Sequence, residues 1–301
     1  MTTTNLKVAA IGLGSMGYGI ATSALRGGHT VWGTDINSDQ TNRFISEGGQ
    51  TTPLSDALNT IDVVIVTVLN AAQTESVLFG ENGVVAGLHE GAAVLSCATV
   101  PPAFAKEMAA RCEAAGVHYL DAPISGGSAK AAQGKLSIMA SGTPAAFAKL
   151  QPVLDSISET VFHLGDEAGA GSAMKAVNQL LAGVHIAAMA EAMTFGMTQG
   201  VTPDKFIEVI SKCAGTSWML ENRAPHIAAG DYTPHSSVNI WPKDLGIVLD
   251  IAKDAQFTAP ITTAALEQFA AAAAMGLGAE DDAAVAKVYA QNAGLTLPGQ
   301  D

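Results

Sequence analysis

Three glycines near the start of the chain restrict its fold more than any other feature. Gly12, Gly14 and Gly17 follow the apolar run Lys7–Ile11 with the spacing G-x-G-x-x-G. After a strand, such glycines allow a tight turn, the approach of a pyrophosphate and close helix–strand packing. A helix that begins there directs free N–H groups toward phosphates. The spacing alone also fits an ordinary glycine-rich turn, but its context predicts a dinucleotide-binding loop. The residues of this loop are Gly12, Leu13, Gly14, Ser15, Met16 and Gly17.

The first half of the chain alternates strand-like runs with stretches long enough for crossover helices, such as Gly17–Gly27 and Pro102–Ala115. Most runs are short, rich in β-branched residues and bounded by Gly, Pro, Asp or Asn, as expected of strands buried on both faces. This alternation predicts an α/β fold with a Rossmann-type, doubly wound parallel sheet. The runs are Lys7–Ile11, Thr30–Thr34, Asp62–Leu69, Ala93–Ala98, Val117–Leu120, Leu136–Ala140 and Val161–Leu164.

After Gly165 the sequence changes character. A stretch of small residues, 166–171, precedes Ser172, a plausible helix cap. One apolar helix is expected from there to about residue 200, buried between two domains. The rest, punctuated by prolines and including an alanine-rich helix at Ala264–Met275, is expected to form a helical bundle. We therefore predict a dinucleotide-binding domain at 1–166 and an all-helical substrate and oligomerisation domain at 167–301.

The charge balance excludes two classes of partner. Fifteen Lys and Arg against 28 Asp and Glu give a net charge of −13, which opposes binding to nucleic acid or to an anionic membrane surface. The apolar segment Leu180–Ala190 is judged too short to span a bilayer, and the first residues have no signal-peptide pattern. Three cysteines without CxxC spacing fit a reducing cytoplasm. We expect a cytoplasmic protein.

An acidic residue ends the second strand, about 20 residues after the glycine loop, where dinucleotide-binding folds hold a ribose. The Asp35 carboxylate can accept hydrogen bonds from both ribose hydroxyls and would repel a 2′-phosphate. No arginine follows at once, since Ile36 is the next residue. The alternative is a solvated loop aspartate. We predict NAD as the cofactor in preference to NADP, with Asp35 and Ile36 beside it.

Other kinds of site fail on spacing. Gly134-Lys135 resembles the end of a phosphate-binding P-loop, but Ala129 replaces its first glycine and Leu136 its Ser or Thr. Histidines and cysteines lack the spacing of a zinc site, and the chain has no G-x-S-x-G elbow. We predict no metal site.

Two further groups of residues have the chemistry of a substrate site. Ser125, Gly126 and Gly127 follow the run that ends at Leu120, and a hydroxyl beside two glycine N–H groups suits a carboxylate. Lys175 lies on the apolar helix, with Asn178 and Gln179 on the same face. A buried cation beside two amides is costly unless it serves chemistry. An ordinary tight turn and a lysine that reaches solvent at a helix start remain alternatives.

Four motifs in order resemble those of the β-hydroxyacid dehydrogenase family, which includes 3-hydroxyisobutyrate dehydrogenase. They are G-L-G-x-M-G at Gly12–Gly17, D-x-P-x-S-G-G-x-x-x-A-x-x-G at Asp121–Gly134, G-x-G-x-x-x-K at Gly169–Lys175 and K-D-L at Lys243–Leu245. The resemblance implies that Lys175 is the catalytic acid/base. It implies that Ser125, Gly126 and Gly127 hold the substrate carboxylate. Leu69, Asn70, Thr99 and Lys243 are then expected to contact the cofactor.

Two positions depart from the usual family pattern: Ile124 replaces valine, and Gln179 stands where asparagine is common. The segments Met174–His185 and Gly230–Pro234 are similar to the L-threonate dehydrogenase branch. The branch implies NAD-dependent oxidation of L-threonate to its 2-oxo acid, with Asn178 and Gln179 on the substrate oxygens. The alternatives are a 3-hydroxyisobutyrate dehydrogenase, a tartronate, succinic-semialdehyde or glyoxylate reductase, or a non-catalytic NAD-binding protein. A homo-oligomer, dimer or tetramer, is expected.

Overall fold

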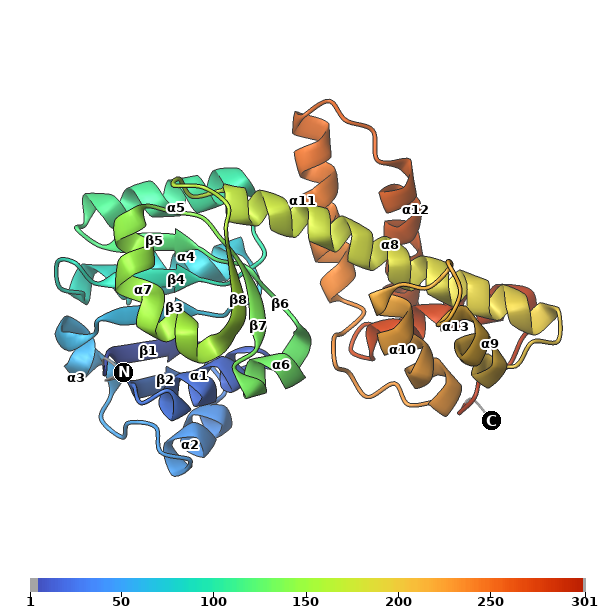
Figure 1. The fold of residues 1–301 in the computed structure, drawn as a ribbon, viewed down its shortest axis with the longest axis horizontal. Helices are drawn as coiled ribbons and strands as arrows, with labels where there is room; N and C mark the ends of the chain where they lie inside the picture. Colours follow the sequence, from blue (N-terminus) through green and yellow to red (C-terminus); the bar gives the residue numbers. More distant parts are fainter. Residues whose placement is uncertain (1–4, 300–301) are drawn as a thin grey trace. The chain divides into compact units, whose positions relative to one another are not determined.

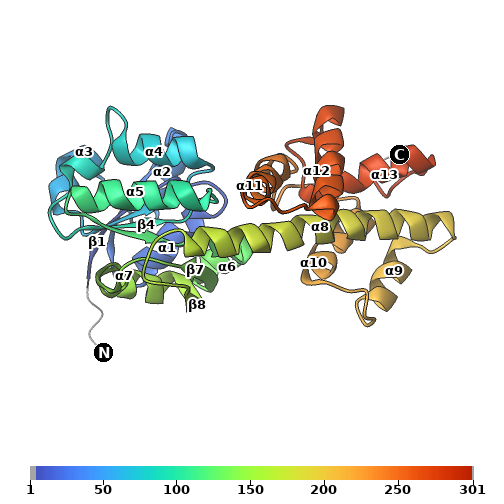
Figure 2. The same ribbon diagram turned by 90° about the horizontal axis from the view of Figure 1, so that it is seen from above.

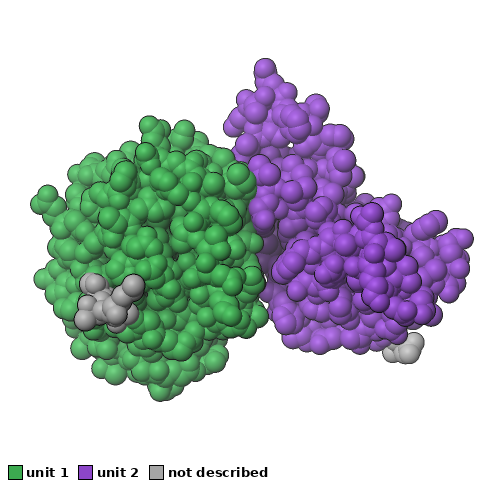
Figure 3. Space-filling view, viewed as in Figure 1, with its two compact units in different colours: residues 1–175 green, residues 176–301 purple. Residues whose placement is uncertain are grey.

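The computed structural model describes residues 5–299. Its contacts divide the chain into two compact units, Met1–Lys175 and Ala176–Asp301, which Figure 3 colours separately. The division falls inside helix α8 (Ala170–Thr198). The units are described in turn.

The first unit is built on a parallel sheet with the strand order β2-β1-β3-β4-β5 (Figure 1). Each neighbouring pair is parallel. The chain turns from β1 to β2 on one side and then crosses to β3 on the other, so the order reverses beside β1. Ligands of open α/β sheets bind at such a switch point, outside the carboxyl ends of the strands. The strands are β1 (Lys7–Ile11), β2 (Thr30–Thr34), β3 (Val63–Val66), β4 (Ala93–Ser96) and β5 (His118–Asp121).

Helices cover both faces of this sheet, as predicted for a doubly wound fold (Figure 2). On one face, α1 (Gly17–Arg26) and α7 (Pro144–Ile157) contribute to one apolar core. On the other, α4 (Ala71–Phe79) and α5 (Pro102–Ala114) contribute to a second. The residues in the middle of each strand are buried, and the central strand β3, Val-Val-Ile-Val, is apolar and buried throughout, as expected of a sheet covered on both faces. Two further helices follow β2, namely α2 (Ser38–Ser46) and α3 (Leu54–Ala57).

A second small sheet, β6-β7-β8, completes the unit. It contains β6 (Ile124–Ser125), β7 (Leu136–Ala140) and β8 (Ser158–His163). β6 pairs with β7 antiparallel, and β8 with β7 parallel. The last predicted run, Val161–Leu164, is a strand as far as His163. Unlike most of the runs, this edge strand is largely exposed, and Phe162 retains 50% of its accessible surface. The short helix α6 (Gly127–Gln133) connects β6 to β7 and packs on α1.

The second unit is helical, as predicted. The rest of α8 packs with later helices around an apolar core that includes Ile186, Met193 and Phe269, and Trp241 stacks on Phe269 with ring centroids 5.4 Å apart. The predicted alanine-rich helix, Ala264–Met275, begins earlier than predicted, at Pro260, and its α-helical part ends at Ala272. A π-helical segment follows to Leu277, and Gly276 interrupts it with a φ of +85°. The helices are α9 (Pro203–Ile210), α10 (Trp218–Ala229), α11 (Ile240–Asp254), α12 (Pro260–Ala272) and α13 (Ala286–Ala293).

Helix α8 confirms the single apolar helix predicted from Ser172 to about residue 200. It contains 29 residues, and by length and composition it could cross a membrane, with a mean hydropathy of 1.4 in its most apolar window. The segment Leu180–Ala190, which alone is too short for a span, lies in the middle of this longer helix. Within the second unit, Ile186, Met189 and Met193 of this helix are buried in the core, as in the core helix of a globular protein.

Candidate functional site

The glycine loop lies at the switch point, where the turn after β1 meets the residue that follows β3. Gly12 has a φ of +92°, and a Cβ there would come within 2.7 Å of the Thr67 carbonyl oxygen. Thr67 Oγ1 donates to the Gly12 carbonyl oxygen at 2.7 Å. A Cβ on Gly17 would overlap the Gly12 carbonyl oxygen and Thr67 Oγ1. These glycines therefore allow two backbone segments to touch, while Gly14 is exposed and a Cβ there would meet no atom of the described chain within 4 Å.

Asp35 fastens the glycine loop to the end of β2. Its Oδ2 accepts a hydrogen bond from the Leu13 N–H at 2.6 Å, and its Oδ1 accepts one from the Asn37 N–H at 2.8 Å. Each carboxylate oxygen has a further lone pair for a ligand hydroxyl. Ile36 is fully exposed. Arg43 stacks over the Tyr18 ring at 4.2 Å and pairs with Glu47, so its guanidinium already has two partners.

The residues predicted to line the cofactor follow the carboxyl ends of β3 and β4. Leu69 is exposed, whereas Asn70 and Thr99 are half-buried. Asn70 also caps α4, since its side chain accepts from the Gln73 N–H at 2.9 Å. Helix α4 therefore begins just beyond the carboxyl end of β3, four residues after Thr67, whose hydroxyl binds the glycine loop.

The turn Ser125–Gly127, which is predicted to hold the substrate carboxylate, begins in strand β6, where Ser125 pairs with Ser137 of β7. The chain then takes two positive φ values, +131° at Gly126 and +76° at Gly127, a conformation that residues with a Cβ adopt only with strain. Gly127 is exposed, and α6 begins there. The N–H groups at the start of this short helix are available to an anion.

Lys175 lies against this loop within the first unit. Its side chain is buried, with 8% of the residue exposed, and Nζ donates to the Ile124 carbonyl oxygen at 2.9 Å. Ile124 directly precedes Ser125, so the structure brings the predicted acid/base next to the predicted carboxylate site. The two motifs lie far apart in the sequence.

A second set of polar residues forms a chain of contacts inside the second unit. Asn178 Nδ2 donates to Gln179 Oε1 at 2.9 Å, and Gln179 Nε2 donates to Asp244 Oδ2 at 2.5 Å. Asp244 Oδ1 pairs with Lys243 Nζ at 2.6 Å. Asp244 is only 3% exposed, so a buried carboxylate links the predicted substrate amides to the predicted cofactor lysine.

Sequence reasoning missed three residues that support these groups. Thr67 and Asp244 are in direct contact with predicted site residues, and Asp121 binds the start of α8. Asp121 and Asp244 each belong to a motif that carried the family resemblance, and that membership was the available signal. Thr67 had no such signal, because its contact with Gly12 depends on the pairing of β1 with β3.

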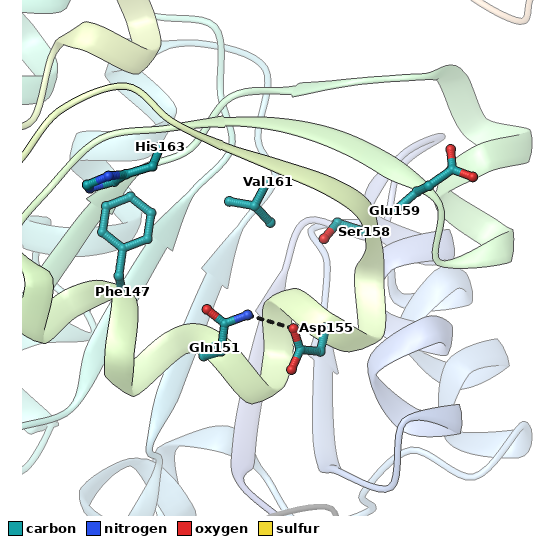
Figure 4. Close-up of a pocket in the computed structure, with 7 residues that line it drawn as sticks. All are labelled: Phe147, Gln151, Asp155, Ser158, Glu159, Val161 and His163. Carbon is teal, nitrogen blue, oxygen red and sulfur yellow. Dashed lines mark hydrogen bonds between the residues drawn. The ribbon is translucent and has the colours of Figure 1, made fainter.

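The surface between α7 and β8 holds a pocket of about 420 Å³ that shares no residue with these groups (Figure 4). In this pocket Gln151 Nε2 donates a hydrogen bond to Asp155 Oδ1 at 2.6 Å. The Phe147 and His163 rings pack edge to face, with their centroids 4.3 Å apart. Glu159 adds a second carboxylate to its lining, which makes the pocket unsuitable for an acid substrate.

Two family models match the chain. The model described as the NAD-binding domain of 6-phosphogluconate dehydrogenase matches residues 7–165. The model described as "NAD-binding of NADP-dependent 3-hydroxyisobutyrate dehydrogenase" matches residues 169–289. The chain belongs to the 3-hydroxyisobutyrate dehydrogenase-like family. It is therefore an NAD-dependent hydroxyacid dehydrogenase, as the resemblance predicted, and this excludes the non-catalytic alternative.

Similar proteins of this dehydrogenase family match nearly the whole chain. An L-threonate dehydrogenase of Cupriavidus necator is 47% identical over 295 residues, which cover 98% of each chain. The L-threonate dehydrogenase of Escherichia coli strain K12 is 44% identical and covers 99% of this chain and 98% of its own. A solved structure described as 3-hydroxyisobutyrate dehydrogenase from Salmonella typhimurium is 44% identical, with a TM-score of 0.89 over 94% of this chain and 100% of that one.

The glycine loop provides a matched pair of substitutions. Gly17→Ala should lower the free energy of unfolding strongly, by about 2 kcal/mol or more, because overpacking of this kind typically costs about 1–3 kcal/mol and the Cβ here meets backbone. Gly14→Ala should keep the wild-type Tm and weaken NAD binding at least tenfold, because its Cβ occupies only ligand space. Thermal unfolding and NAD titration measure both. Equal Tm losses in the two variants would contradict this assignment.

Proposed function

We propose that this dehydrogenase oxidises the C2 hydroxyl of L-threonate to the 2-oxo acid, with NAD as the oxidant. The observation that carries the proposal is the 2.9 Å contact of Lys175 Nζ with the Ile124 carbonyl oxygen, which holds a buried lysine beside Ser125. The relatives named L-threonate dehydrogenase, at up to 47% identity, support the choice of substrate.

In this proposal the carboxylate of the substrate binds to the Ser125 hydroxyl and to the N–H groups of Gly126 and Gly127. The net charge of the chain is −13, so an anion needs such directed donors. Lys175 Nζ accepts the proton of the C2 hydroxyl as the C2–H bond breaks. Bound NAD supplies the acceptor for the hydride, and a carbonyl remains on C2. Holding the reactants beside a proton acceptor contributes proximity as well as general base catalysis.

The glycine loop residues Gly12–Gly17 suit a dinucleotide, because Gly14 leaves space for a pyrophosphate and α1 begins at Gly17. We assign the ribose hydroxyls to Asp35, beside Ile36. We assign the remaining contacts with the cofactor to four residues, Leu69, Asn70, Thr99 and Lys243.

The polyol tail of the substrate is assigned to Asn178. Gln179 is buried and its amide is engaged at both ends, by Asn178 and by Asp244. Gln179 therefore orients the half-buried Asn178 side chain, which binds a tail hydroxyl. A site built to hydrogen-bond a hydroxyl discriminates strongly against analogues that lack it.

Oxidation of 3-hydroxyisobutyrate is the second candidate, because the 44% identical structure from Salmonella typhimurium bears that name. A branched alkyl tail would leave the Asn178 amide without a hydroxyl partner. The polar pair at this position therefore favours the sugar acid.

We further propose that the cofactor domain extends over 1–166, the helical substrate and oligomerisation domain over 167–301, and that the protein is a cytoplasmic homo-oligomer. The free cysteines Cys97, Cys112 and Cys213 support a reducing compartment. Exposed apolar residues along α8, among them Val177, Leu181 and Phe195, support self-association, which light scattering measures directly.

The substrate assignment is tested by NADH production from five acids: L-threonate, D-erythronate, 3-hydroxyisobutyrate, D-glycerate and 4-hydroxybutyrate. L-Threonate should give the highest kcat/KM. Asn178→Ala should lower that value at least tenfold for L-threonate and leave turnover of 3-hydroxyisobutyrate within about twofold, because only the former bears the tail hydroxyl. A higher kcat/KM for 3-hydroxyisobutyrate in the wild type would refute the assignment.

Lys175→Met should lower kcat by about 10²–10⁴-fold, the usual contribution of general acid–base catalysis. The side chain keeps its bulk, so the variant should fold and bind NAD with wild-type affinity. Lys149→Met is the matched control, since this lysine pairs with Asp62 just before β3 and should leave kcat unchanged. A folded Lys175→Met variant with most of its kcat would show that Lys175 is not the base.

Asp35→Asn should raise the use of NADP relative to NAD by at least tenfold in kcat/KM, because it removes the charge that repels a 2′-phosphate. The amide keeps one oxygen to accept from the Leu13 N–H. Asp39→Asn, in the exposed first turn of α2, is the control for lost charge and should not change the ratio. If wild-type efficiencies with NAD and NADP were equal, the proposed cofactor preference would be wrong.

A further inference from the structure

Asp121 is a buried carboxylate for which the proposed reaction has no role. It ends strand β5, retains 1% of its accessible surface and contacts the beginning of helix α8. Its Oδ2 accepts from the N–H groups of Gly169 and Ser172, at 2.9 and 2.8 Å. Its Oδ1 accepts from Ser172 Oγ at 2.6 Å. The carboxylate therefore provides acceptors for donors that a helix start otherwise leaves without partners.

Ser141 extends this cap. Its Oγ donates to Asp121 Oδ2 at 3.3 Å and accepts from the Gly171 N–H at 2.9 Å. The backbones of Asp121 and Ser141 also exchange two hydrogen bonds, of 3.0 and 2.8 Å. The first turn of α8 is thus attached to two strands at once, β5 through Asp121 and the end of β7 through Ser141.

The packing around the cap leaves little freedom for this turn. Gly169 has a φ of +105°, and a Cβ on Gly171 would lie 2.7 Å from the Asp121 carbonyl oxygen. The Met139 carbonyl oxygen, at 2.4 Å, and Asp121 Oδ2, at 3.2 Å, would also meet this Cβ, so the first turn of α8 lies tightly against both strands. Lys175 follows in the next turn of the same helix, and its Nζ reaches the Ile124 carbonyl oxygen. Asp121 and Ile124 lie on one short segment, so the cap and the lysine contact hold α8 to the same piece of chain.

The charge of Asp121 acts on its surroundings as well. Burial raises the pKa of this carboxyl, while hydrogen bonds from Ser172 and Gly169 oppose the rise. Burial raises the pKa of Cys97 to about 12, and the negative charge of Asp121 adds to that rise. An anion at the start of a helix is favourable against the positive end of the helix dipole.

We propose that Asp121 is a positioning residue: its carboxylate fixes the first turn of α8 and so holds Lys175 against the Ile124 carbonyl, beside Ser125. This inference rests on the proposed role of Lys175 and extends it to a residue that touches neither substrate nor cofactor. A displacement of about 1 Å at a reacting group can cost about 10²-fold in rate.

The test is Asp121→Asn, which keeps the shape of the side chain and removes its charge and one acceptor oxygen. The variant is assayed with whichever hydroxy acid the wild type oxidises fastest. We expect kcat for oxidation to fall about 10–100-fold, while the Kd for NAD stays within twofold of wild type. The KM for the hydroxy acid should change less than kcat, because the Ser125 turn that is proposed to bind its carboxylate is unaltered.

Asp62→Asn is the matched control. Asp62 is also a partly buried carboxylate with backbone and lysine partners, the Lys7 N–H at 3.0 Å and Lys149 Nζ at 2.9 Å. It precedes β3, at the opposite end of the strand from the glycine loop's partner Thr67. This variant should lose stability, while its kcat stays within twofold of wild type.

Hydrogen exchange provides a readout that does not depend on activity: the amides of Gly169 and Ser172 should exchange at least tenfold faster in Asp121→Asn than in the wild type. If that variant does not fold, Ser172→Ala, which removes one donor and keeps the charge, should give faster exchange and a threefold or greater loss of kcat. If Asp121→Asn kept kcat within twofold of wild type, or if the Gly169 and Ser172 amides exchanged at the wild-type rate, the proposal would be overturned. Failure of Lys175→Met to lower kcat would instead overturn the proposed function.

Discussion

The first unit depends on one close approach of backbone to backbone. The turn after β1 can touch the end of β3 only because Gly12 and Gly17 lack a Cβ, and the Thr67 hydroxyl joins the two segments. This contact places the start of α1 at the point where the strand order reverses. The carboxyl ends of β3 and β4, and the residues that follow them, then lie along the same edge. The dinucleotide site is a consequence of that packing.

Three aspartates have a common task in this acidic chain. Asp35 holds the Leu13 N–H, Asp121 holds the N–H groups at the start of α8, and Asp244 holds both Gln179 and Lys243. Each binds a part of the protein at or beside the predicted site, and Asp35 is assigned to the ribose of the cofactor as well. Charge-assisted hydrogen bonds are shorter and stronger than neutral ones, so these carboxylates hold the glycine loop, the first turn of α8 and the Gln179 side chain in place. The excess of acidic residues is thus compatible with an anion-binding enzyme.

The sequence predicted most of the strands in the first unit well, because short apolar runs bounded by turn residues are typical of buried strands. β1, β2 and β7 begin and end where the pattern placed them. It was less informative for β8, whose largely exposed residues have no burial pattern of their own. Pairing with β7 makes that segment a strand, and pairing is a long-range property.

The motifs alone determined the chemical class of the protein: a glycine loop after a strand, an acid after the second strand, a serine–glycine turn and a lysine on an apolar helix. These features are local, so neighbouring residues suffice to define them. Only the tertiary structure decided which groups meet. It brought Lys175 to the Ile124 carbonyl, tied Gln179 to Asp244 and buried Asp121 under the start of α8. The physical reason is that a hydrogen bond between segments dozens of residues apart depends on how strands and helices pack, and no spacing in the sequence records that geometry.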